Sequence, residues 1–127
     1  MKAEGGERMR RDMDFVRQLL IDISNEKCKT NFVRGSEDEI YLYHLKIMKQ
    51  AGFIEFNLNE HKSGAFLFDV PTLTWLGNDY LDAISNDTVW NKTKEGIKSK
   101  GLELGQISFE ILKEYAKLEL KKMLGIL

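Results

Sequence analysis

The chain of 127 residues has one cysteine, one proline and two histidines. Because a lone cysteine, Cys28, can form no disulfide within the chain, the sequence agrees with a reducing compartment. Two histidines and one cysteine do not make a zinc ligand set, and no HExxH, CxxC or EF-hand pattern occurs. We therefore expect no bound metal.

Long apolar runs and signal patterns are also missing. No uninterrupted apolar segment is long enough to span a bilayer. The first residues, MKAEGGERMRRDMD, carry charges and glycines where a secretory signal needs an apolar stretch. We therefore expect a cytoplasmic protein.

Patterns that mark catalytic or nucleotide sites are absent from the sequence as well. The segments GLELG and GERMRR fit neither the Walker nor the dinucleotide-binding glycine pattern, and no serine lies in a GxSxG elbow. The acidic pairs Asp12/Asp14 and Asp79/Asp82 are better explained as helix caps and solvated faces than as acid–base catalysts. We therefore predict a protein that binds no cofactor and is not an enzyme.

The composition is that of a globular domain. Apolar residues make up 43% of the chain and charged residues 31%, and no Ser-, Gly- or Pro-rich linker divides it. A single domain is therefore expected. The net charge of −1 is unevenly distributed, with +2 over residues 1–34, −6 over residues 35–87 and +3 over residues 88–127. Any surface built from the middle of the chain is expected to be acidic.

A first helix is predicted after Asp12, which can cap it, and should end near Ser24 or Asn25. The short segment KTNFV, residues 29–33, is a candidate strand beside a later hairpin. The helix is indicated by an apolar stripe with helical spacing, made of Met13, Val16, Leu20 and Ile23, with Phe15 and Leu19 beside it.

A second helix is predicted over residues 36–51, because Ser36 and Glu39 have the spacing of a capping box. Gly52 suits a left-handed cap at its end. His44, mid-helix, is expected to be a partly buried imidazole rather than a metal ligand. The apolar positions form one face with Ile40, Tyr43, Ile47 and Ala51, and a neighbouring face with Tyr41, Leu45 and Met48.

A β-hairpin is predicted next, because the hydrophobic period changes from helical to alternating after Phe53. Its strands would be IEFNLN and AFLFDV, joined by the loop EHKSG, and Pro71 would end the pairing.

The segment LTWLGNDYLDAISNDTVWNKTKEG, residues 73–96, is interpreted as a capped corner between helices. Thr74 can cap a third helix, Gly77 in its first turn permits close packing, and Asp87 can cap a fourth helix. After a break over residues 101–105, Ser108 can begin a last helix with two apolar sides. One side carries Phe109, Leu112, Ala116, Leu120 and Met123, and the other carries Ile111, Tyr115 and Leu118.

The order of these elements is similar to that of winged-helix domains: helix, short strand, capped helix ending in AGFI, hairpin and a further helix. YHLKIMKQAGFI, residues 43–54, resembles the end of a recognition helix and the start of a wing. Between the first helix and Ser36 there are too few residues for the usual extra helix and turn, so the helix-turn-helix pair is incomplete. We therefore predict a mostly helical α+β fold, winged-helix-like, with a truncated helix-turn-helix, a hairpin wing and added C-terminal helices.

Several motifs together resemble a domain family of unknown function found in small bacterial, often prophage-borne, proteins. The motifs are MRRDMDFVRQLL, YHLKIMKQAGFI, LTWLGNDYLDAISNDTVWNKTK and SFEILKEYAK, and DTVWNKTK is the most specific part. The resemblance covers nearly everything from Met9 onward and implies a single domain over residues 9–127 with a mobile leader at residues 1–8. It implies no active site.

Two functions remain open. The first is a protein-interaction module, either homodimeric or docking another protein, with Trp90, Ile111, Tyr115 and Leu118 as the candidate interface. The alternative is that Trp75, Trp90 and the last helix are simply core, and core is the favoured interpretation for any single one of these residues.

The alternative is a DNA-binding regulator that uses the 36–51 helix and the wing. Its helix begins with three consecutive acidic residues, which disfavours phosphate binding, so partner binding ranks first. The candidate DNA contacts are Arg10, Arg11, Arg17, Lys46, Lys49, His61 and Lys62.

Overall fold

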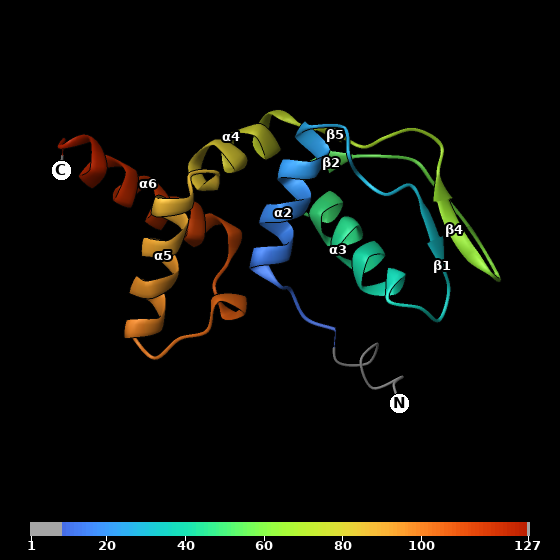
Figure 1. Cartoon of the computed structure of the whole chain (residues 1–127), viewed down its shortest axis with the longest axis horizontal. Helices are drawn as coiled ribbons and strands as arrows, with labels where there is room; N and C mark the ends of the chain where they lie inside the picture. Colours follow the sequence, from blue (N-terminus) through green and yellow to red (C-terminus); the bar gives the residue numbers. More distant parts are fainter. Residues whose placement is uncertain (1–8, 127) are drawn as a thin grey trace. The chain divides into compact units, whose positions relative to one another are not determined.

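The structure, a computed structural model, describes residues 9–126. It divides into two compact units, one ending at Asn78 and the other beginning at Asp79 (Figure 1). Helix α4, Trp75–Ile84, runs across this division. The single domain expected over residues 9–127 stays a prediction, and the predicted mobile leader, residues 1–8, lies outside the described residues.

The first unit begins with helix α2, Met13–Ser24, whose bounds agree with the prediction. The Asp12 carboxylate accepts a hydrogen bond from the Phe15 backbone N–H at 3.1 Å, as expected of an N-cap. The predicted apolar stripe is buried, with Met13, Val16, Leu19, Leu20 and Ile23 in the core.

Helix α3, Asp38–Gln50, lies between α2 and the sheet (Figure 1). It begins two residues later than predicted, and the predicted capping box was wrong: the N-cap is Glu37, which makes no side-chain cap hydrogen bond. The Ser36 hydroxyl accepts instead from the Asp38 N–H and the Glu39 carboxylate from the Gly35 N–H, so residues 34–37 form turns. Its end agrees with the prediction: Gly52 has φ +83°, and the Phe53 N–H donates to the Met48 carbonyl at 3.0 Å. Burial favours the face with Leu45 and Met48, whereas Ile40 is 46% exposed.

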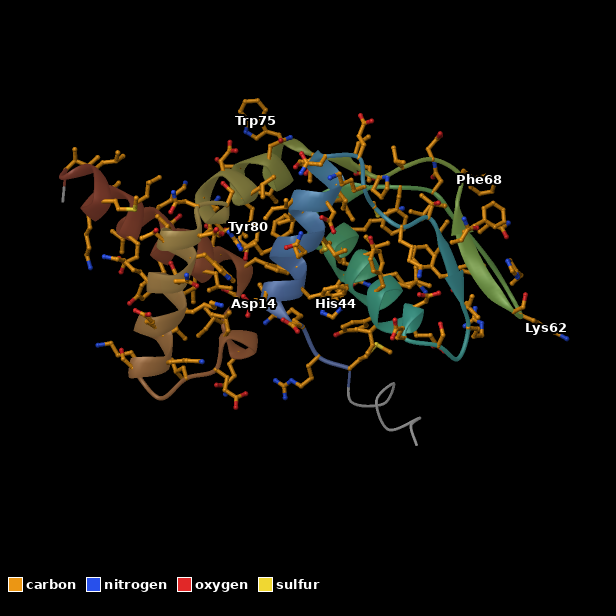
Figure 2. All side chains as sticks on the ribbon, viewed as in Figure 1. Asp14, His44, Lys62, Phe68, Trp75 and Tyr80 are labelled. Carbon is orange, nitrogen blue, oxygen red and sulfur yellow. The ribbon has the colours of Figure 1, made fainter. Side chains whose placement is uncertain are left out.

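His44 of α3 is fully buried and links this helix to the start of α2 (Figure 2). Its Nε2 accepts a hydrogen bond from the Asp12 backbone N–H at 2.9 Å. Its Nδ1 lies 2.8 Å from the Ile40 carbonyl oxygen, so Nδ1 carries the proton and donates it. The ring is therefore a neutral connector that satisfies one of the unpaired donors at the N-terminus of α2.

Replacing His44 with leucine is expected to lower the free energy of unfolding by about 2 kcal/mol, because the Asp12 N–H loses its acceptor in a partly buried position. Urea denaturation followed by circular dichroism measures the change. His61→Leu, at the exposed histidine, is the matched control and should change stability by less than about 0.5 kcal/mol. Equal effects of the two substitutions would contradict this connecting role of His44.

Over the described part of the first unit, residues 9–78, five short strands form two antiparallel sheets. The three-stranded sheet has the order β1-β4-β3, with strands β1 Asn31–Val33, β4 Gly64–Leu67 and β3 Leu58–His61. The two-stranded sheet pairs β2, Ile54–Glu55, with β5, Thr72–Leu73. The predicted hairpin and the strand beside it are therefore confirmed, with two differences. The first predicted strand changes partner midway, and the hairpin loop is only Lys62 and Ser63, since His61 pairs with Gly64.

The start of α4 is fixed to the end of α3 within the first unit. The Thr74 N–H donates to the Phe53 carbonyl at 2.9 Å, and the Thr74 hydroxyl donates to the Gly52 carbonyl. That hydroxyl oxygen also accepts from the Gly77 N–H at 3.0 Å, which confirms Thr74 as the cap. The opening of the 73–96 segment is thus a structural junction, as predicted.

The second unit consists of the rest of α4, helix α5 (Asp87–Ser99), a 3₁₀ turn η1 (Leu104–Gln106) and helix α6 (Phe109–Leu124). Ser108 caps α6 as predicted, its hydroxyl accepting from the Ile111 N–H at 3.2 Å. The predicted cap of α5 was wrong by one residue: the Asn86 side chain accepts from the Val89 N–H at 3.0 Å, and Asp87 is the first helical residue.

The fold is thus α+β and mostly helical, as predicted. The described residues 25–37 hold β1 and turns but no helix, so α2 and α3 are not joined as a complete helix-turn-helix pair. The more specific likeness to winged-helix domains stays a prediction. No helix among residues 9–126 is both long enough and apolar enough to cross a membrane.

Candidate functional site

The outer face of α6 is the candidate interaction surface, and it lies entirely within the second unit. The opposite face packs against α5, with Leu112 and Ala116 fully buried. Gly96 of α5 lies against the Tyr115 ring, since a Cβ at Gly96 would lie only 2.7 Å from the Tyr115 Cζ. This packing fixes which side of α6 faces solvent.

Two of the four predicted interface residues, Ile111 and Leu118, are exposed on this outer face, and Tyr115 lies at its edge. Ile111 is 57% exposed and Leu118 46%, while Tyr115 between them is half-buried against α5. Their spacing of four and three residues aligns them on one stripe of a helix. Further apolar residues are exposed at the end of the helix and just beyond it, namely Met123, Leu124 and Ile126.

Trp90, the fourth predicted interface residue, is placed differently. It is 2% exposed and belongs to the buried side of α5 with Val89 and Ile97, so its ring is core and does not lie on the α6 surface. Trp75 is the opposite case, because its side chain is 90% exposed at the first turn of α4 (Figure 2). The exposure of Trp75 could have been predicted from the sequence, because on a helical wheel Trp75 falls opposite the stripe of Leu81 and Ile84.

The solvent face of the three-stranded sheet carries a row of three rings, His61, Phe66 and Phe68, that the sequence did not predict. The His61 and Phe66 ring centroids are 6.2 Å apart, and those of Phe66 and Phe68 are 5.2 Å apart. Phe68 is 61% exposed (Figure 2), and Val33 on β1 is 60% exposed. The alternation in AFLFDV predicted one buried and one exposed face, but not that the larger side chains would be the exposed ones.

The lysines of α3 that were predicted to contact DNA are engaged within the first unit. Lys46 Nζ lies 3.1 Å from Glu60 Oε1 of β3, and Lys49 Nζ donates to the Phe56 carbonyl at 2.7 Å. Lys49 also lies over the Phe56 ring, 4.7 Å from its centroid. Both lysines therefore bind residues that follow α3 in the chain: Lys46 binds Glu60 of β3, and Lys49 binds Phe56.

The remaining candidate DNA contacts belong to two separate segments. Lys62 is exposed at the hairpin tip (Figure 2), and His61, the last residue of β3, is also exposed. Arg10 is exposed, and Arg11 is half-buried, in the segment before α2, while Arg17 is half-buried on α2. The structure therefore places these cations on two elements and not along α3.

A pocket of about 190 Å³ lies in the first unit between α3, β1 and the hairpin. Its charged groups bond to each other or to the backbone: Arg34 Nη2 lies 3.8 Å from Glu60, and the Asp38 carboxylate accepts from Lys29 Nζ and the Val33 N–H. The Lys29 and Val33 hydrogen bonds hold the pKa of Asp38 below its ordinary value. The carboxylate is thus a structural acceptor for β1.

Cys28 contacts Tyr41 of α3, with the Tyr41 hydroxyl 3.5 Å from Cys28 Sγ. Burial raises the pKa of the Cys28 thiol, which disfavours the reactive thiolate. Among the described residues, no three His, Cys, Asp or Glu side chains gather where they could hold a metal ion.

Comparisons with known proteins agree with the sequence resemblance. A family described as "Hypothetical protein (DUF2513)" matches residues 10–103. An "Uncharacterized protein" of Haemophilus influenzae is 36% identical over 126 residues, which cover 92% of this chain and 100% of that protein. No solved structure matches. The chain therefore belongs to the uncharacterised DUF2513 family.

Proposed function

We propose that this protein is a non-catalytic, prophage-linked interaction module that binds protein through the outer face of α6. The observation that carries the proposal is the apolar stripe of Ile111, Tyr115 and Leu118, of which Ile111 and Leu118 are exposed while Tyr115 packs against Gly96 of α5 at the edge of the stripe. A helix that is apolar on two sides has more hydrophobic surface than one packing partner requires. Exposed apolar and aromatic residues on one face are typical of protein interfaces.

A photo-cross-linker at Leu118 tests this proposal. With p-benzoylphenylalanine at this position, irradiation of bacterial cells that express the protein is expected to give an adduct of discrete mass. Adding Ile111→Lys to the same chain should remove the adduct, because a buried lysine charge disfavours docking on the stripe. Denaturing electrophoresis and mass spectrometry provide the measurement.

Leu102 is the matched control for this experiment. It belongs to the same unit and is 45% exposed, against 46% for Leu118, but it lies outside α6. The same cross-linker at Leu102 should give no discrete adduct. Failure of Leu118 to cross-link, or equal labelling at both positions, would contradict a docking role for α6.

DNA binding is the second candidate, and the hairpin tip is the observation that favours it. Lys62 is placed to contact a phosphate, and the exposed ring of Phe68, with the half-buried ring of Phe66 beside it, is placed to stack on unpaired bases. It ranks second because Lys46 and Lys49 are held by contacts within the unit. Duplex binding at low salt that weakens steeply as salt is added would support it, and no binding at low salt would remove it.

A further inference from the structure

Four charged residues follow one side of the apolar stripe on α6. At about 100° per residue, Glu110, Glu114, Lys117 and Lys121 fall within about 60° of one another on the same flank. Glu110, Glu114 and Lys121 are exposed, and Lys117 is half-buried. Along the helix this flank therefore changes from two negative charges to two positive ones.

This order of charges places like charges next to each other within the helix. Glu110 and Glu114 are four residues apart, as are Lys117 and Lys121, and like pairs at this spacing are unfavourable. The helix dipole favours Glu110 in the first turn and Lys121 in the last turn, but its effect fades away from the ends. Glu114 and Lys117, near the middle, form one opposite-charge pair three residues apart, and Lys113 interacts with Glu110 and Glu114, so these contacts offset part of the like-charge repulsion.

We propose that α6 pairs in antiparallel orientation with α6 of a second copy of this chain, which deepens the function proposed above and rests on it. In an antiparallel pair, the same flank of each helix faces its counterpart. The negative half of one flank, Glu110 and Glu114, then lies opposite the positive half of the other, Lys117 and Lys121. Both like-charge pairs gain further opposite charges as neighbours, and the two apolar stripes meet between them.

A parallel pair does not provide this match. It would place the charged flank against the other side of the partner's stripe, which carries Leu112 and Glu119. Leu112 is fully buried in the second unit, and the Glu119 side chain is only 12% exposed. Between two copies of the chain, the charge pattern therefore favours the antiparallel over the parallel arrangement.

Two charge-reversed proteins test the pairing. One carries Glu110→Lys and Glu114→Lys, and the other carries Lys117→Glu and Lys121→Glu, so that each flank has a single sign. Purified wild-type chain is expected to change from one-chain to two-chain mass by light scattering as its concentration rises from about 1 to 500 μM, since a single helix pair is a small interface. Each variant alone should associate at least about tenfold more weakly, because like charges would face each other.

Mixing the two variants is the decisive measurement. An equimolar mixture should recover the two-chain species, because an all-lysine flank then faces an all-glutamate flank. This recovery should weaken as salt is added. Circular dichroism of each variant checks that its helices are retained, which is expected because the changed positions lie on the solvent side of α6.

The outcomes distinguish this inference from the function on which it rests. A wild-type chain that stays monomeric over this range, or a mixture that does not recover association, would overturn antiparallel self-pairing. If the Leu118 cross-linker then gives an adduct whose mass is not that of two copies, α6 docks a different protein and only the self-pairing fails. If neither experiment detects association, both proposals fail.

Discussion

Replacing Trp90 with alanine is expected to lower the free energy of unfolding of the second unit by about 3–5 kcal/mol. The side chain is 2% exposed, so its removal leaves a large cavity beside Val89 and Ile97 in addition to the lost burial of the ring. Small domains are typically stable by only about 5–15 kcal/mol, so this loss is a large part of the total. Guanidinium denaturation followed by far-ultraviolet circular dichroism measures it.

Trp75 is the control for this prediction, because it is the same residue type at the start of the neighbouring helix. Its side chain is 90% exposed, and Trp75→Ala should change stability by less than about 0.5 kcal/mol. Fluorescence provides a second measurement: with Trp75 replaced by phenylalanine, the remaining Trp90 emission should be blue-shifted and should shift to the red on unfolding. Similar losses of stability from Trp75→Ala and Trp90→Ala would contradict the placement of Trp90 in the core.

Short-range signals in the sequence predicted much of the fold. Asp12, Thr74 and Ser108 cap their helices because a side-chain oxygen two or three residues before a free N–H can reach it regardless of what surrounds the helix. Gly52 adopts the left-handed conformation that ends α3, for a reason that is equally local. Where two neighbouring residues could both cap, as at Asn86 and Asp87, spacing alone did not choose between them.

Long-range pairing was the part that the sequence did not determine. The alternation after Phe53 predicts extended chain, but it carries no information on the change of partner from β5 to β4. His44 shows the same limit, because its acceptor role depends on an N–H thirty-two residues earlier in the chain. The sheet pattern likewise predicted two faces without deciding that Phe66 and Phe68 would be on the outer one.

The candidate site was predicted in part. Ile111, Tyr115 and Leu118 were separated from the core side of α6 by helical spacing alone. The exposure of Ile111 and Leu118 and the burial of Leu112 and Ala116 agree with that division, whereas Tyr115 packs against Gly96 of α5. The tryptophans were not assigned in this way, because hydrophobic size favours core and interface alike. Periodicity distinguishes them: Trp90 shares a face with Thr93 and Ile97, whereas Trp75 opposes the apolar stripe of α4.

Gly77→Ala is expected to destabilise the first unit by about 3 kcal/mol or more, against the usual effect of this substitution in a helix. Helix propensity alone would favour alanine over glycine by about 1 kcal/mol. A Cβ at Gly77, however, would lie 2.0 Å from the Phe53 carbonyl oxygen and 2.9 Å from its carbon. Both atoms are backbone, and that oxygen also accepts from the Thr74 N–H, so the contact cannot be relieved by a side-chain rotation.

At Gly77, helix propensity favours alanine whereas the clash with the Phe53 backbone disfavours it. Urea denaturation of the alanine variant therefore decides which effect is larger. Gly35→Ala is the control, because Gly35 is required for its left-handed backbone conformation and not for close packing. Gly35 has φ +81°, and a Cβ there would meet nothing within 4 Å. Its loss should be about 1 kcal/mol, from backbone conformation alone. A Gly77→Ala protein as stable as wild type, or more stable, would mean that α4 does not begin in contact with Phe53. The interpretation of the 73–96 segment as a junction built by close backbone approach would then be wrong.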